Sequence, residues 1–82
     1  MSFIEEIKSK LDLSKLYGYR MLLVGGAGVV IEGHRGVYEI SDTIIRIRVK
    51  KGSIIVNGHD LIIKDISDSE IYIEGSIKGI EL

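Results

Sequence analysis

The stretch from Thr43 to Lys50 reads TIIRIRVK and alternates between apolar and basic side chains. Two sets of residues take turns along it: Ile45, Ile47 and Val49 in one set, Arg46, Arg48 and Lys50 in the other. Successive side chains of a β-strand point to opposite faces. The pattern therefore predicts a half-buried strand with an apolar face toward a core and a basic face toward solvent.

Outward from this stretch, short apolar runs alternate with turn signals from Arg20 to the last residue, which is typical of all-β domains. We expect strands near residues 20–24, 28–32, 36–41, 43–50, 53–57, 60–66, 70–75 and 77–81. Asn57-Gly58 is the strongest hairpin signal, because a type I′ turn needs positive φ at both central residues. Links this short favour antiparallel neighbours, since parallel pairing needs long crossovers.

Two of the expected strands are apolar on both faces, because Ile54-Ile55-Val56 and Leu61-Ile62-Ile63 are uninterrupted. One thin sheet cannot cover two apolar faces. A closed roll, a two-layer sandwich or a partner subunit must cover the second. A strand-then-glycine pattern also recurs at residues 30–34, 55–59 and 72–76. Its spacing is not constant, and a short β-solenoid stays open as an alternative.

The N-terminal stretch has a helical pattern instead. Ser2 and Glu5 have capping-box spacing. An apolar stripe follows, made of Phe3, Ile4, Ile7 and Leu11. We therefore predict a helix over residues 3–12. The predicted fold class is mainly β: a small antiparallel roll or sandwich of about seven to eight short strands with one N-terminal helix.

The chain has 82 residues, enough for a single domain with a thin core, and no cysteine that could form a disulfide. A thin core without disulfides, together with strands that are apolar on both faces, predicts a homo-oligomer. The net charge of −1 gives no general attraction for nucleic acid or anionic lipid. The longest apolar run, residues 21–31, is far shorter than the roughly 20 residues of a spanning helix, so no transmembrane segment is expected.

One charged feature is a candidate partner-binding site. It is the basic stripe of Arg46, Arg48, Lys50 and Lys51. Such a stripe can bind phosphates or acidic partners. No aromatic residue is interleaved to stack bases, so nucleic acid is disfavoured. A second possibility is that the stripe is solvated, or paired across strands with the acidic residues Glu32, Glu39, Glu70 and Glu74.

Catalysis is not indicated. The glycine-rich run at 25–28 is followed by strand sequence, where a phosphate loop needs a helix. His34 and His59 each follow a glycine, and we interpret both as turn residues. The structural turn residues expected here are Gly33, His34, Arg35, Gly36, Asn57, Gly58 and Gly75. No nucleophile–base pair or metal-ligand set is recognisable, so we expect no enzyme and no cofactor.

The segment IEGHRGVYEIS from Ile31 to Ser41 precedes a basic strand, a Lys-Gly turn, an LIIKDI strand and a closing IYIEGSI segment. This series resembles the YabP/YqfC family of sporulation proteins and is closest to the YqfC branch. The resemblance runs from about Leu11 to Leu82, and we expect residues 1–82 to form a single domain of this kind. Its most specific parts, residues 32–37 and 74–77, are motifs of turns and strands.

The resemblance implies a role in endospore formation in the mother cell, without a known activity or cofactor. It also implies a cytoplasmic location, or a peripheral one at the forespore membrane or coat, beside a companion membrane protein of the YqfD type. Our leading hypothesis is a non-catalytic scaffold or adaptor. The alternative is a ligand- or partner-binding regulatory β domain that uses the basic strand Arg46–Lys51.

Overall fold

The computed structural model describes residues 18–82, and six strands make up this part of the chain. Their bounds are β1 Arg20–Val24, β2 Gly28–Glu32, β3 Val37–Ile40, β4 Ile44–Val49, β5 Gly52–Ile66 and β6 Glu70–Glu81. They form one antiparallel sheet in the order β1-β2-β6-β5-β4-β3. This confirms the all-β antiparallel prediction and excludes the β-solenoid. The predicted helix at 3–12 lies outside the described residues.

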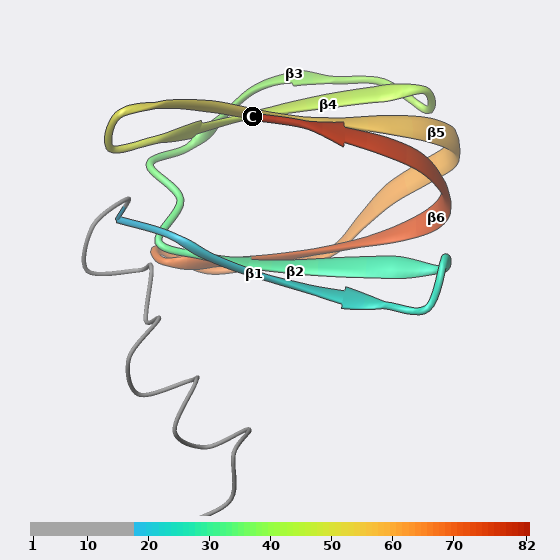
Figure 1. Cartoon of the computed structure of the whole chain (residues 1–82), viewed down its shortest axis with the longest axis horizontal. Helices are drawn as coiled ribbons and strands as arrows, with labels where there is room; N and C mark the ends of the chain where they lie inside the picture. Colours follow the sequence, from blue (N-terminus) through green and yellow to red (C-terminus); the bar gives the residue numbers. More distant parts are fainter. Residues whose placement is uncertain (1–17) are drawn as a thin grey trace, which may run out of the picture.

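The sheet is open, because its end strands β1 and β3 do not pair with each other. It nevertheless folds over on itself, since the long strands β5 and β6 bend halfway along their length (Figure 1). One layer holds β1, β2, the first half of β6 and the second half of β5, and we call it the lower layer. The upper layer holds β3, β4, the first half of β5 and the second half of β6.

The bend has a local cause in β5 and β6. The pairing of these strands shifts register between Asn57 and Gly58 and again between His59 and Ile62. Asp60 has φ of 55° and Gly75, on the facing strand, has φ of 144°. Such bulges bend a strand and increase its twist. The corner therefore turns both strands together from one layer into the other.

The predicted hairpin at Asn57-Gly58 is wrong. Both residues lie inside β5, where Asn57 faces Gly79 and Gly58 faces Ile77. Gly58 is needed for close approach, because a Cβ there would collide with the carbonyl oxygen of Ser76. The expected strands 53–57 and 60–66 are thus two halves of β5, and 70–75 and 77–81 are two halves of β6.

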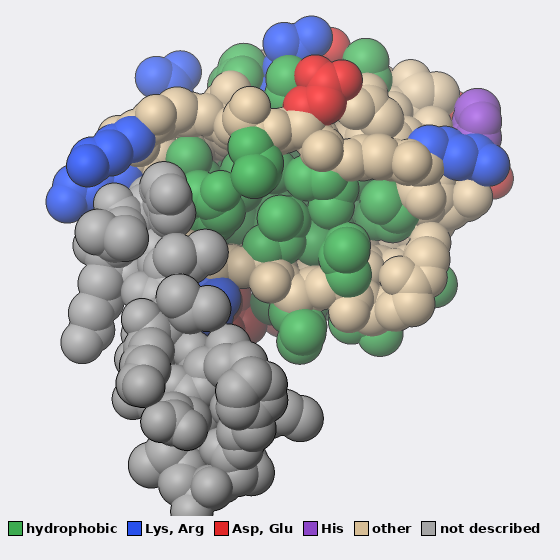
Figure 2. Space-filling view, viewed as in Figure 1, with side chains coloured by type: hydrophobic (Ala, Val, Ile, Leu, Met, Phe, Trp, Pro, Cys, Tyr) green, Lys and Arg blue, Asp and Glu red, His purple; other side chains and the backbone are tan. Residues whose placement is uncertain are grey.

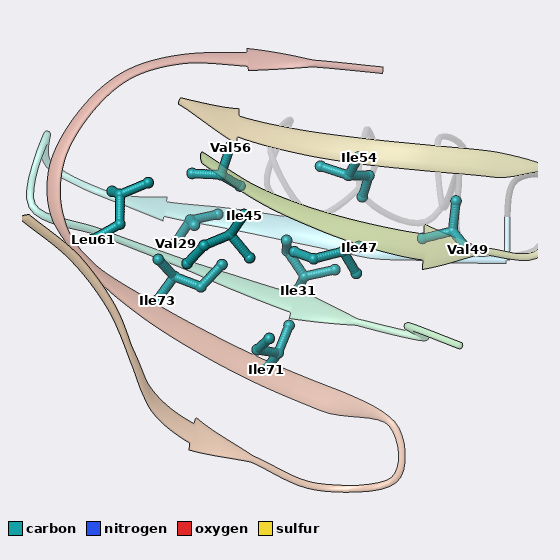
Figure 3. Close-up of a cluster of buried hydrophobic side chains, with 10 residues drawn as sticks. All are labelled: Val29, Ile31, Ile45, Ile47, Val49, Ile54, Val56, Leu61, Ile71 and Ile73. Carbon is teal, nitrogen blue, oxygen red and sulfur yellow. The ribbon is translucent and has the colours of Figure 1, made fainter. Parts of the chain in front are cut away.

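The core lies between the two layers and is built of β-branched residues and leucine. Figure 3 shows side chains from both layers pointing toward one another. The buried set is Val29, Ile31, Ile45, Ile47, Val49, Ile54, Val56, Leu61, Ile71 and Ile73. The alternation of β4 places Ile45 and Ile47 in this core, as its sequence predicts. Burial of this apolar surface is the main force that holds the two layers together.

Candidate partner-binding surfaces

The basic side of β4 faces away from the core, on the outside of the upper layer. Arg46 lies opposite Glu39 of β3, and its Nε is 2.6 Å from Oε1 of that carboxylate. The Nε–H group is not aligned as a hydrogen bond, so the contact is an electrostatic one. Both side chains are partly exposed, and such pairs contribute at most about 1 kcal/mol. Arg46 is thus neutralised within the sheet.

The other basic residues gather at one end of the molecule. The Arg48 guanidinium lies over the Tyr38 ring, 5.4 Å from its centroid, in a cation–π contact. Lys50 and Lys51 follow in the β4–β5 turn, and Arg35 donates its backbone N–H to the Arg48 carbonyl at 2.6 Å. Figure 2 shows Lys and Arg side chains over this turn, at the left of the view.

We call Arg35, Arg48, Lys50 and Lys51 the basic end. All four are exposed. Within residues 18–82 no carboxylate forms an ion pair with any of them. The stripe predicted from the sequence therefore divides in two: Arg46 is paired with an acid, and the remaining cations stand together at the end of β4 with Arg35 added.

The other acidic residues expected opposite the stripe lie in the lower layer. Glu32 pairs with Arg20 at 2.7 Å, and Glu74 lies 3.8 Å from the Lys64 ammonium. Glu74 also accepts a hydrogen bond of 2.9 Å from the Tyr72 hydroxyl. That hydrogen bond, with burial and the Glu74 charge, raises the pKa of Tyr72 above 10.0.

The two histidines have separate environments. His34 is buried in the β2–β3 connection, and its Nε2 lies 2.8 Å from the carbonyl oxygen of Ser67. Its Nδ1 accepts from the backbone N–H of Gly36 at 3.1 Å, so Nε2 is the donor to Ser67. His59 is exposed in the bend of β5. His34 therefore ties the β2–β3 connection to the β5–β6 turn.

The glycines beside His34 have backbone roles. Gly33 has φ of 90° and Gly36 has φ of 125°, values that other residues rarely adopt. Gly33 donates its N–H to the Ser69 carbonyl at 2.6 Å, and a Cβ there would collide with the carbonyl oxygen of Gly18. The connection at 33–36 is thus a packed junction between the start of the described chain, the β4 end and the β5–β6 turn.

A second surface was not predicted as a site. The outside of the lower layer carries an apolar row in which Leu22 faces Val30, and Val30 faces Tyr72. Val24 and Ile62 lie in the next row of the same face. We call these five residues the outer apolar face, and Leu22 is 63% exposed in it. The sequence feature that indicates this face is the uninterrupted run Leu61-Ile62-Ile63. Because side chains alternate along a strand, at least one apolar residue of this run must lie outside the core.

The described part of the chain also carries a pocket beside the outer apolar face. A shallow pocket of about 300 Å³ is lined by Arg20, Met21, Leu22, Val30 and Glu32, in which the two charges pair with each other. No group of three or more potential metal ligands occurs among residues 18–82. The same residues contain no helix long and apolar enough to cross a membrane.

The chain is similar to known proteins in sequence. The model of the YabP family matches residues 18–82, which is the whole described part of the chain. The chain is also 38% identical over 58 residues to the uncharacterized protein YqfC of Bacillus subtilis (strain 168). That match covers 71% of this chain and 62% of YqfC, so the chain spans less than two thirds of the length of this relative.

Proposed function

The chain belongs to the YabP family, and from this premise we propose that it is a non-catalytic sporulation protein that acts by binding. Its task is that of a small scaffold or adaptor in spore morphogenesis. The function belongs to surfaces and not to a reaction centre, because the charged groups of residues 18–82 pair or lie in solvent without forming a nucleophile–base set.

The outer apolar face is the observation that carries this proposal. Leu22, Val24 and Ile62 are exposed although the core between the layers is already filled by other residues. In the row of Val24 and Ile62, Gly28 and Glu74 lie between the two apolar side chains, whereas Leu22, Val30 and Tyr72 are direct neighbours. Exposed apolar side chains grouped on one face of a small domain mark a site of protein contact. Tyr72 adds a large side chain with a polar tip, a residue type enriched at interfaces.

The partners we propose are a second copy of this chain and a companion membrane protein of the YqfD type. Binding to the second would hold the protein at the forespore membrane or the assembling coat, on the mother-cell side. The same face can form a homo-oligomer, because in an isologous contact the outer apolar face of one copy packs against the outer apolar face of the other.

A second candidate function uses the basic end. Four exposed cations without an acidic partner in residues 18–82 favour an acidic ligand or protein segment. In that case the chain is a regulatory domain whose partner supplies the negative charge. The two functions require different surfaces on different layers, and substitutions can therefore separate them.

The test of the scaffold function is the double variant Leu22→Glu, Ile62→Glu. We expect it to abolish self-association in sedimentation velocity at micromolar concentration, and to abolish co-purification of partners from sporulating cells. Ile40→Glu, Ile66→Glu is the matched control, because Ile40 is 64% exposed, Ile66 is 52% exposed, and both lie off the outer apolar face. A wild-type chain that stays monomeric and captures no partner would contradict the proposal.

The regulatory alternative is tested with Arg48→Glu, Lys51→Glu, which reverses charge at the basic end. Lys78→Glu, which reverses one exposed cation of β6, is the control for charge reversal outside the basic end. Loss of partner capture and spore yield in the double variant alone would favour the basic end. Unchanged binding and spore yield would leave it a solvated surface.

A further inference from the structure

One flank of the folded sheet is open and apolar. It lies between β1 at the edge of the lower layer and the second half of β6 at the edge of the upper layer (Figure 1). Figure 2, in the same view, shows hydrophobic side chains filling the space between these two edges. We call this surface the open flank, and its residues are Met21, Leu23, Ile77, Ile80 and Leu82.

The residues of the open flank continue the core. Met21 faces Ile31, Leu23 faces Val29 and Ile80 faces Val56, and these partners are fully buried. Met21, Ile77 and Ile80 pack against the core cluster. Leu23 is nevertheless 54% exposed and Leu82 is 77% exposed. The core is therefore left uncovered along this side.

The described chain begins beside this flank, at the level of the gap between the layers. A Cβ on Gly18 would lie 2.9 Å from Cβ of Lys50, in the β4–β5 turn of the upper layer. Gly33, at the end of β2 in the lower layer, contacts Gly18 from the other side. Tyr19 packs against the core and β1 follows at once. Gly18 thus lies between the two layers.

Seventeen residues precede this point, and their sequence has an apolar stripe. The stripe of Phe3, Ile4, Ile7 and Leu11 would extend roughly 12 Å along a helix. The five residues of β1 extend about 16 Å. The residues between Leu11 and Gly18 can reach back roughly 23 Å when extended, which spans the whole of β1. The length of the stripe and the position of Gly18 therefore allow the stripe to lie along the open flank.

We propose that residues 3–12 form a helix that covers the open flank of the same molecule, with its apolar stripe on Leu23, Ile80 and Leu82. A helix this short is marginal alone in water, and the flank supplies the apolar contact that it lacks. The tether raises the effective concentration of the segment to the millimolar range, well above a second copy at micromolar concentration. The inference is independent of the proposed scaffold function.

The chain contains no cysteine, so one reporter can be placed without interference. Lys8→Cys, on the polar side of the predicted helix, carries a nitroxide spin label on the full-length chain. We expect nuclear magnetic resonance signals of Leu23, Ile80 and Leu82 to be broadened. Signals of Ile40 and Ile66, which are exposed on the β3 and β5 edges of the opposite flank, serve as internal controls and stay sharp.

Two further samples separate the alternatives. Ile7→Glu, placed in the stripe, should restore the signals of the open flank, whereas Ser9→Glu on the other side of the helix should not. A mixture of spin-labelled chain and isotope-labelled chain without the label reports contacts between copies. Broadening in that mixture as strong as in the single labelled chain means that a second copy supplies the segment, which overturns the proposal. Sharp open-flank signals, or broadening at the outer apolar face instead, overturn it as well.

Discussion

His34 is a buried polar side chain whose two ring nitrogens both have partners. Nε2 donates to the carbonyl oxygen of Ser67, and Nδ1 accepts from the N–H of Gly36. A buried polar group without a partner costs free energy, so this satisfied ring stabilises the junction at which three connections meet. Its role is structural, and its place in the molecule follows from the positive φ of the glycines on either side.

We predict that His34→Ala lowers the free energy of unfolding by about 1–3 kcal/mol, because the Ser67 carbonyl and the Gly36 N–H lose their partner. His59→Ala is the matched control. Because His59 is exposed, we expect its substitution to change the free energy of unfolding by no more than about 0.5 kcal/mol. Urea unfolding followed by circular dichroism measures both. Equal effects of the two substitutions would contradict this role for His34.

Tyr72 gives a prediction about pH. Its hydroxyl donates to Glu74, and this bond, with burial and the nearby carboxylate, raises the pKa of the phenol above 10.0. The folded state therefore holds the proton more tightly than the unfolded state. The resulting stabilisation is present below pH 10.0 and is lost as the pH rises through the folded-state pKa of Tyr72.

Ultraviolet absorbance of the phenolate measures this pKa, and Tyr72→Phe assigns the late-titrating signal. Glu74→Gln should move the Tyr72 pKa down toward 10.0, since it removes the carboxylate charge. A Tyr72 pKa unchanged by Glu74→Gln would show that the carboxylate is not the cause.

At the scale of elements, the bend of β5 and β6 decides the architecture. The two strands shift register together where Gly58 approaches the Ser76 backbone and Gly75 approaches Asp60. A Cβ at Gly75 would lie 2.8 Å from the Asp60 carbonyl oxygen. The corner therefore depends on the absence of side chains at facing positions, and bulges supply the local change of direction.

Gly58→Ala should lower the free energy of unfolding by roughly 1–3 kcal/mol, because the added methyl group overpacks the corner against Ser76. Gly79→Ala in β6 is the control, since no atom lies within 4 Å of a Cβ at that position. We expect Gly79→Ala to change the free energy of unfolding little. Chemical denaturation compares the two, and a Gly58→Ala protein as stable as Gly79→Ala would disprove the crowded corner.

At the scale of the whole molecule, one core joins both layers. Ile54 of the upper layer and Ile73 of the lower layer are fully buried in the same cluster. Neither half of the sheet has a core of its own, because each buries its apolar face only against the other. The two halves are therefore expected to unfold as one cooperative unit.

Ile54→Val and Ile73→Val should each lower the free energy of unfolding by about 0.5–1.5 kcal/mol, and each variant should unfold in a single transition. Ile62→Val, on the outer apolar face, should change it by less than about 0.5 kcal/mol. Tyrosine fluorescence and circular dichroism should give coincident transitions. Two separate transitions in either core variant would contradict the single core.

Much of the secondary structure could be predicted from the sequence. The strand limits of β1 and β2 and the inward set of β4 follow from runs and alternation of apolar residues, which act through local backbone geometry. The alternation of β4 predicts that its basic residues face outward, and they do. The sequence does not decide whether Arg46 is solvated or paired with Glu39, and it does not place Arg35 beside Arg48.

What the sequence determined by itself is therefore the strands and which side chains alternate along them, because these depend on neighbours close in the chain. The tertiary structure alone decided that Asn57-Gly58 continues a strand instead of reversing it, and that β5 and β6 each serve two layers. That choice depends on Gly58 meeting Ser76 and on Gly75 meeting Asp60, contacts between residues far apart in the chain. A local turn propensity is weaker than the burial of a shared core, and the longer-range contacts prevail.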